Sequence, residues 1–157
     1  MRIIAGTARG RRLETREGME VRPTPERVKE ALFNILQFQI EGRRVLDLFA
    51  GSGQLGLEAL SRGAAEAVFV DAARESADVV RRNIAAVQAE GRAKVFQMDY
   101  EAFLLRRQEP FDIIFLDPPY RSGLLEKALP LAAAAAAPAG TIVAEHPTDG
   151  GVPGTAG

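Results

Sequence analysis

Short apolar runs alternate with helical patterns along most of the chain, and this alternation limits the fold more than any other feature. The apolar runs are candidate strands at residues 43–50, 67–72, 94–99, 111–117 and 141–146. Between them, apolar residues recur at helical spacing, as Val79, Ile84 and Val87 do. Strands that alternate with helices are typical of a parallel sheet covered by helices. The pattern therefore predicts an α/β fold with a doubly wound, mostly parallel sheet.

A helix and a small hairpin are expected ahead of this core. Thr24 is a candidate N-cap and Pro25 suits the first helical position. The apolar face of the helix that follows should pack on the sheet and holds Val28, Leu32, Ile35 and Leu36. Segments 2–6 and 11–15 are expected to form a β-hairpin, joined by a turn rich in glycine and arginine.

The length of 157 residues and the 46% hydrophobic content fit one domain with a real core. We expect a single domain 1–157, with a basic hairpin arm at 1–24, a core at 25–146 and a flexible tail at 147–157. Pro130 should kink or split the last helix. The alanine run 132–137 favours helix but offers little volume for packing, so this helix should be weakly anchored.

Acidic residues follow four of the five predicted strands. They are Asp47, Asp71, Asp99 and Asp117. Ligands of open α/β sheets bind at the carboxyl ends of the strands, so these four carboxylates should line one crevice. A single aspartate before a helix is as often an N-cap as a ligand contact, and that alternative stays open for each one.

The stretch "GSGQLG" at residues 51–56 fits the G-x-G-x-x-G pattern of nucleotide-binding loops, and Asp71 follows about twenty residues later. Asp47 argues against a dinucleotide, because a carboxylate near a pyrophosphate would cost roughly 4 kcal/mol at 4 Å and an effective dielectric near 20. S-adenosylmethionine instead carries an ammonium and a sulfonium, which a carboxylate attracts. Asp71 could then accept hydrogen bonds from the ribose hydroxyls, and Asp99 could accept one from the adenine amine.

The motif "DPPY" at residues 117–120 follows the apolar strand "FDIIFL". The exocyclic amine of a base is a poor nucleophile, because its lone pair is delocalised into the ring. The Asp117 carboxylate and the Pro118 carbonyl can accept the two amine hydrogens and aim the lone pair at a methyl group. Pro119 stiffens the turn, and Tyr120 offers a ring on which an extruded base can stack. The alternative is a plain proline-rich turn.

Charge is unevenly distributed, although the net charge is only −1. Residues 1–30 hold eight basic and five acidic residues, which suits contact with a polyanion as well as a solvated turn. The chain has no cysteine and one histidine, His146, so a thiolate or multi-histidine metal site has no support and we expect no metal. No signal peptide or transmembrane run is visible, and we expect a cytoplasmic protein with no membrane partner.

Taken together, these segments resemble the class I S-adenosylmethionine-dependent methyltransferases. More narrowly, they resemble the RsmD-type family, which methylates the exocyclic amine of a guanine in bacterial small-subunit (16S) ribosomal RNA. The resemblance rests on "RIIAG" with "RGRRL", "RPTPERVKEALFNIL", "VLDLFAGSGQLGLEALSRGA", "FDIIFLDPPY" and "VAEH". The choice of guanine over adenine comes from the resemblance alone.

The resemblance implies three sets of site residues. Cofactor contacts are expected from Asp47, Phe49, Gly51, Ser52, Gly53, Asp71, Asp99 and Tyr100. Contacts with the target guanine are expected from Asp117, Pro118, Pro119 and Tyr120. Contacts with RNA phosphates are expected from Arg9, Arg11, Arg12, Arg22 and Arg27. The implied partner is ribosomal RNA or the small-subunit particle, and we expect a monomer.

The chain departs from the family pattern at two places, and three other functions stay open as alternatives. Members usually continue past "EH" with a further hairpin, which we expect to be missing here, and Gln54 stands where a small or apolar residue is commoner. The alternatives are a DNA adenine or cytosine amino-methyltransferase, for which 157 residues leave no room for a separate target-recognition domain, and a catalytically weak RNA-binding or assembly factor. A dinucleotide enzyme comes last, because of Asp47.

Overall fold

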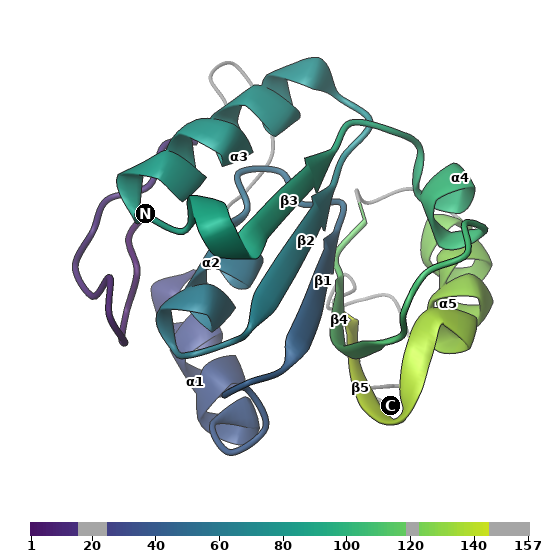
Figure 1. Cartoon of the computed structure of the whole chain (residues 1–157), viewed down its shortest axis with the longest axis horizontal. Helices are drawn as coiled ribbons and strands as arrows, with labels where there is room; N and C mark the ends of the chain where they lie inside the picture. The colour runs from purple at the N-terminus through teal and green to yellow at the C-terminus, as the bar shows by residue number, and fades with distance from the viewer. Residues whose placement is uncertain (16–24, 119–122, 145–157) are drawn as a thin grey trace.

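The computed structural model describes residues 1–15, 25–118 and 123–144, and its centre is a sheet of five parallel strands (Figure 1). The strands are β1 (Arg44–Leu48), β2 (Glu66–Val70), β3 (Ala93–Phe96), β4 (Phe111–Leu116) and β5 (Ala136–Ala144), in the order β3-β2-β1-β4-β5. The helices are α1 (Glu26–Leu36), α2 (Gln54–Ser61), α3 (Arg74–Ala86), α4 (Tyr100–Leu104) and α5 (Leu124–Ala135), with a 3-10 turn at Glu90–Arg92. The predicted doubly wound α/β fold is confirmed.

Alternation along each strand divides the core into two layers. Side chains such as Val45 and Phe69 join the apolar cluster under α1, α2 and α3. Their neighbours, such as Leu46 and Val70, join the cluster under α4 and α5. The two helix layers lie on opposite sides of the sheet in Figure 1. Because both faces are covered, the central strands can be apolar almost throughout.

The buried face of α1 differs from the expected one. Lys29, Phe33 and Leu36 are buried, whereas Val28 is 40% and Ile35 74% exposed. The stripe turns toward the core because the Lys29 ammonium finds polar partners there: it donates to the Arg2 carbonyl at 2.8 Å and lies 3.5 Å from a Glu58 oxygen. The helix also begins one residue later than predicted, with Pro25 in the cap position; Thr24 lies outside the described residues.

The last helix and strand also correct the sequence prediction. Pro130 does not split α5, which runs unbroken through it; the ring lies on the exposed side, where water can hydrate the carbonyl that loses its partner. The alanine run does not stay helical to its end, because Ala136 and Ala137 belong to β5. Regular pairing of β5 with β4 covers Thr141–Ala144, after a register shift opposite Phe111–Ile113. The tail 147–157 lies outside the described residues.

The N-terminal arm folds back along the α2 side of the molecule. Its two branches meet at one isolated antiparallel bridge, Arg2 with Arg12, and the Ile3 and Leu13 amides donate across at 2.9 Å each. The expected hairpin is therefore present as a short pairing without regular strands. Ile3 and Leu13 are buried in the core, which anchors the arm. Among the described helices, none has the length and apolar character needed to cross a bilayer.

Candidate active site

The order of the strands places the candidate site between β1 and β4. The chain runs outward from β1 to β2 and β3, then returns to the other side of β1 as β4, which makes β1/β4 the switch point where such sheets bind ligands. Leu48 pairs with Val70 on one side and with Leu116 on the other. The next residue of each strand is therefore Phe49, Asp71 or Asp117, and these three emerge side by side at one edge of the sheet.

The glycine loop that follows β1 is fixed by hydrogen bonds from two directions. The Gly51 amide donates to Asp71 Oδ2 at 2.9 Å, and the Gly53 amide donates to the Ala50 carbonyl at 2.8 Å. Both glycines have positive φ, 61° and 82°, and a Cβ on Gly51 would meet no atom within 4 Å. The loop thus leaves open space above Gly51, where a ligand can approach the backbone.

Gly56, the third glycine of the motif, serves helix packing. A Cβ there would lie 2.4 Å from a ring carbon of Phe69 and 3.2 Å from the Asp47 Cβ. Gln54, the departure from the family pattern, begins α2 and is buried, and its Oε1 has no hydrogen-bond partner among the described residues. The close contact at Gly56 brings the first turn of α2 directly onto β1 and β2.

Asp47 lies inside β1 and not at its end. Alternation turns its side chain toward α2, where it is 2% exposed and Oδ2 accepts the Gly56 amide at 2.9 Å. Burial raises the pKa of the Asp47 carboxyl to about 8; the Gly56 amide opposes the shift, and the charges of Asp117 and Asp71 add to it. The site therefore holds a carboxyl group that only a nearby cation would keep charged at neutral pH.

Asp71 and Asp99 occupy different positions. Asp71 follows β2 directly and also accepts the Ala73 amide at 2.9 Å, so its carboxylate orders the loop and has further acceptor capacity for a ligand. Asp99 lies three residues beyond the end of β3, because that strand stops at Phe96 and not at 99 as expected. Its Oδ2 caps α4 by accepting the Glu101 and Ala102 amides, so the N-cap alternative is realised for Asp99.

An aromatic pair covers the same edge of the sheet. Phe49 has a φ of 63°, which is uncommon for a residue with a side chain, and strain of this kind concentrates at functional sites. Its ring packs against Tyr100 with 5.1 Å between the centroids. The two rings form an apolar wall on which a planar group can lie. Both belong to the predicted cofactor set.

The first half of the "DPPY" motif lies at the expected edge. Asp117 follows β4 and is partly exposed, whereas Pro118 is buried. Pro119 and Tyr120 lie outside the described residues. Within the described part of the chain, no three acidic or histidine side chains gather into a group that could ligate a metal.

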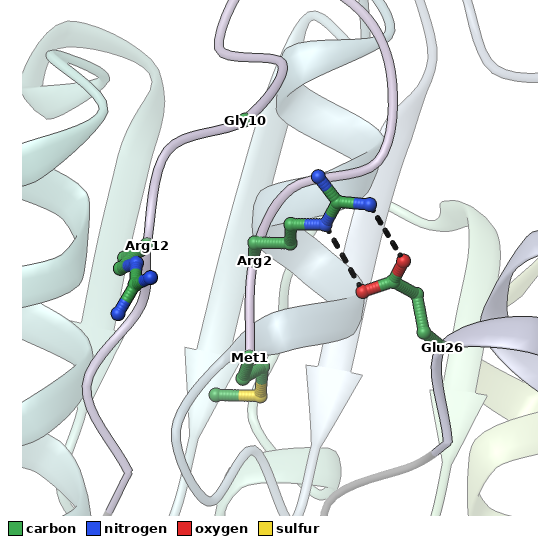
Figure 2. A pocket seen from close by; sticks show the side chains of 5 residues that line it. All are labelled: Met1, Arg2, Gly10, Arg12 and Glu26. Carbon is green, nitrogen blue, oxygen red and sulfur yellow. Dashed lines mark hydrogen bonds and ion pairs between the residues drawn. The ribbon is translucent and has the colours of Figure 1, made fainter.

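The predicted RNA contacts lie on the arm and at the start of α1. Arg9, Arg11, Arg12 and Arg27 are exposed; Arg22 lies outside the described residues. A hollow of about 440 Å³ is lined by Met1, Arg2, Gly10, Arg12 and Glu26, whose arrangement is drawn in Figure 2. Glu26 accepts two bonds from the Arg2 guanidinium, at 3.0 and 3.2 Å, while the Arg12 side chain lies on the other branch of the arm (Figure 2).

Three buried polar residues that hold the arm were missed by the sequence analysis. Glu58 accepts the Ile4 and Ala5 amides at 2.9 and 3.0 Å, and Ser61 Oγ accepts the Ala8 amide at 2.9 Å. Asn83 binds the backbone of Glu14 and of Ser52. The available signal was a polar residue inside a helical segment that otherwise packs on the core.

Comparison with known proteins identifies the family of the chain. The family described as "Conserved hypothetical protein 95" matches residues 1–156. Ribosomal RNA small subunit methyltransferase D of Escherichia coli (strain K12) is 44% identical over 131 residues, 83% of this chain and 66% of that protein. YlbH of Bacillus subtilis (strain 168) is 40% identical over 162 residues, which cover all of this chain and 88% of YlbH.

A solved structure agrees with the sequence matches. That of yhhF from Escherichia coli superposes with a TM-score of 0.86 at 41% identity, covering 98% of this chain and 84% of the other. The chain therefore belongs to the family described as Conserved hypothetical protein 95, with a class I methyltransferase fold, and the resemblance to RsmD-type enzymes that its motifs carry is confirmed.

Proposed function

We propose that the protein is an RNA methyltransferase that uses S-adenosylmethionine to methylate the exocyclic amine of a guanine in small-subunit (16S) ribosomal RNA. The observation that carries the proposal is the group of three carboxyls, Asp47, Asp71 and Asp117, around an open glycine loop at the β1/β4 switch point. The name of the E. coli relative supports ribosomal RNA as the substrate. Guanine and its exocyclic amine rest on the resemblance.

The residues of this chain fit S-adenosylmethionine better than a dinucleotide. A buried carboxyl with a pKa of about 8 gains most from a ligand that brings a positive charge. The cofactor carries that charge, and bound in this site it would supply an electrophilic methyl group. Asp47 and the glycine loop would hold the amino-acid end of the cofactor, while Asp71 would accept hydrogen bonds from its ribose hydroxyls. Phe49, Tyr100 and Asp99 would surround the adenine.

The remaining groups act on the base. The Asp117 carboxylate and the Pro118 carbonyl accept the amine hydrogens, which returns electron density to the nitrogen and orients its lone pair. Tyr120 stacks on the extruded base, and the proton of the methylated amine passes to Asp117 or to solvent. The exposed arginines of the arm, with Arg22 and Arg27, neutralise RNA phosphates. No step requires a metal ion.

The first test is calorimetric titration with S-adenosylhomocysteine, with a nicotinamide dinucleotide titrated in parallel. Binding of the former alone is expected, and binding of the dinucleotide alone would overturn the proposal. Transfer to transcribed 16S ribosomal RNA is then measured, with the modified base identified by mass spectrometry. Asp117→Ala should abolish transfer while cofactor affinity stays within a few fold. Asp78→Ala, at a partly exposed aspartate of α3 that pairs with Arg81, is the matched control.

A further inference from the structure

The base of the N-terminal arm rests directly on the glycine loop. Ser52 Oγ lies 3.7 Å from the Met1 sulfur, a weak contact, and the Leu13 amide donates to the Met1 carbonyl at 2.9 Å. Both branches of the arm, residue 1 and residues 13–14, therefore meet beside Ser52. This residue lies between the two glycines with positive φ, in the part of the loop that we assign to the cofactor.

Asn83 of α3 joins these two segments with a single side chain. It is 1% exposed, and its amide nitrogen donates to the Ser52 carbonyl at 2.9 Å and to the Glu14 carbonyl at 3.0 Å. Its amide oxygen accepts the Glu14 amide at 2.8 Å. Three of the four hydrogen bonds available to an asparagine are thus made, all to backbone. A buried amide that lost one of these partners would be left with an unsatisfied polar group, which is unfavourable.

The bond to Ser52 fixes the peptide group between Ser52 and Gly53. The carbonyl end of this group is held by Asn83, and its N–H end donates to the Ala50 carbonyl at 2.8 Å. Rotation of that peptide would break both bonds. The conformation of the loop above which the cofactor is proposed to bind therefore depends on the same side chain that holds the arm.

We propose that Asn83 is a positioning residue that couples the cofactor loop to the basic arm, so that cofactor binding and RNA binding strengthen one another. The inference rests on the proposed function, in which the loop holds the cofactor and the arm holds RNA. A ligand that orders either segment also fixes Asn83, which then helps to order the other segment. The second ligand therefore loses less conformational entropy when it binds. By linkage, the two ligands must strengthen each other by the same factor.

A neighbouring residue provides the matched control. Arg82 donates to the Glu14 side chain at 2.9 Å, but both groups are 56% exposed and this contact does not involve the glycine loop. Arg82→Ala thus loosens the arm alone, whereas Asn83→Ala releases both segments. Asn83→Asp keeps the acceptor for the Glu14 amide but removes both donated bonds, to the Ser52 and Glu14 carbonyls, with little change in volume.

The test measures the affinity of the full chain for transcribed 16S ribosomal RNA, without and with saturating S-adenosylhomocysteine. We expect the cofactor product to tighten RNA binding at least fivefold in the wild type. The ratio of RNA affinities with and without S-adenosylhomocysteine should fall close to one in Asn83→Ala and Asn83→Asp. In Arg82→Ala it should persist, even where RNA binding is weaker overall.

Two results would overturn the inference alone: both ligands bind the wild type without affecting each other, or the Asn83 variants keep the wild-type factor. If the wild type binds no S-adenosylhomocysteine, the proposed function fails and this inference fails with it. Because the Asn83 variants can fail to fold, a wild-type measurement stands beside them. RNA should slow amide hydrogen exchange in residues 50–56, and unchanged exchange there would also contradict the coupling.

Discussion

Replacement of Asp47 by asparagine tests how the site holds a cation. In the free protein the Asp47 carboxyl, with a pKa of about 8, is mostly protonated at neutral pH. A cofactor ammonium would favour its charged form, so binding should release a proton and the observed affinity should rise with pH. If the complex keeps Asp47 ionised, the affinity rises roughly 50-fold between pH 6 and pH 8, or about 2 kcal/mol.

The same pKa fixes how the stability of the free protein depends on pH. The pKa of Asp47 in the folded chain lies above its ordinary value of 3.8, so the folded state keeps a proton that the unfolded state loses. The free energy of unfolding should therefore fall as the pH rises from about 4 through about 8, by roughly 2 kcal/mol between pH 6 and pH 8. The Asp47→Asn variant cannot ionise there and should lack this decline.

Calorimetry with S-adenosylhomocysteine at pH 6, 7 and 8 measures the affinity, and two buffers of different ionisation enthalpy count the protons released. The amine of the ligand titrates equally with both proteins, so the ratio of wild-type to Asp47→Asn affinity isolates residue 47. Urea unfolding at the same pH values measures stability. A ratio that stays constant from pH 6 to pH 8 would refute the assignment of Asp47 as the buried group that meets the cation.

The remaining predictions concern stability, measured by urea unfolding. Gly56→Ala should cost about 1–3 kcal/mol, because its Cβ would lie 2.4 Å from a fully buried Phe69 ring; Gly91→Ala, with no atom within 4 Å, should be near neutral, and equal effects would contradict the packing argument. Glu58→Gln should cost about 3–5 kcal/mol, because it leaves the Lys29 ammonium buried without its counter-charge; a cost below about 1 kcal/mol would show that the pair contributes little. Asp99→Ala should cost about 1 kcal/mol through loss of the α4 cap, and no change would mean that the cap is dispensable.

The strands were predictable because both faces of a central parallel strand are apolar, which leaves uninterrupted runs. The direction of the Asp47 side chain was harder to predict, because an uninterrupted apolar run does not indicate which face of the sheet each residue lies on. Asp47 pairs with Phe69 of β2, whose side chain lies in the core layer under α2, and this register places the Asp47 side chain beneath α2. The glycine loop and Asp117 were predictable, because both follow strands directly.

The buried face of α1 could not be read from the sequence. Lysine is normally exposed, and its burial here depends on Glu58, which lies 29 residues further along the chain. Ile35, which the apolar pattern placed inward, is therefore largely exposed. The role of Asn83 could not be predicted from the sequence either. Its side chain binds two backbone segments, at Glu14 and Ser52, that come together only in the folded chain.

The docking of the arm has a consequence for how the protein folds during synthesis. Residues 4–8 bind side chains 53 and 54 positions later, and Glu14 binds one 69 positions later. During synthesis, residues 4–14 must therefore wait until α2 and α3 have been made and packed. At about 5–20 residues per second, this leaves the arginine-rich segment without its partners for several seconds, within reach of the ribosome's own RNA.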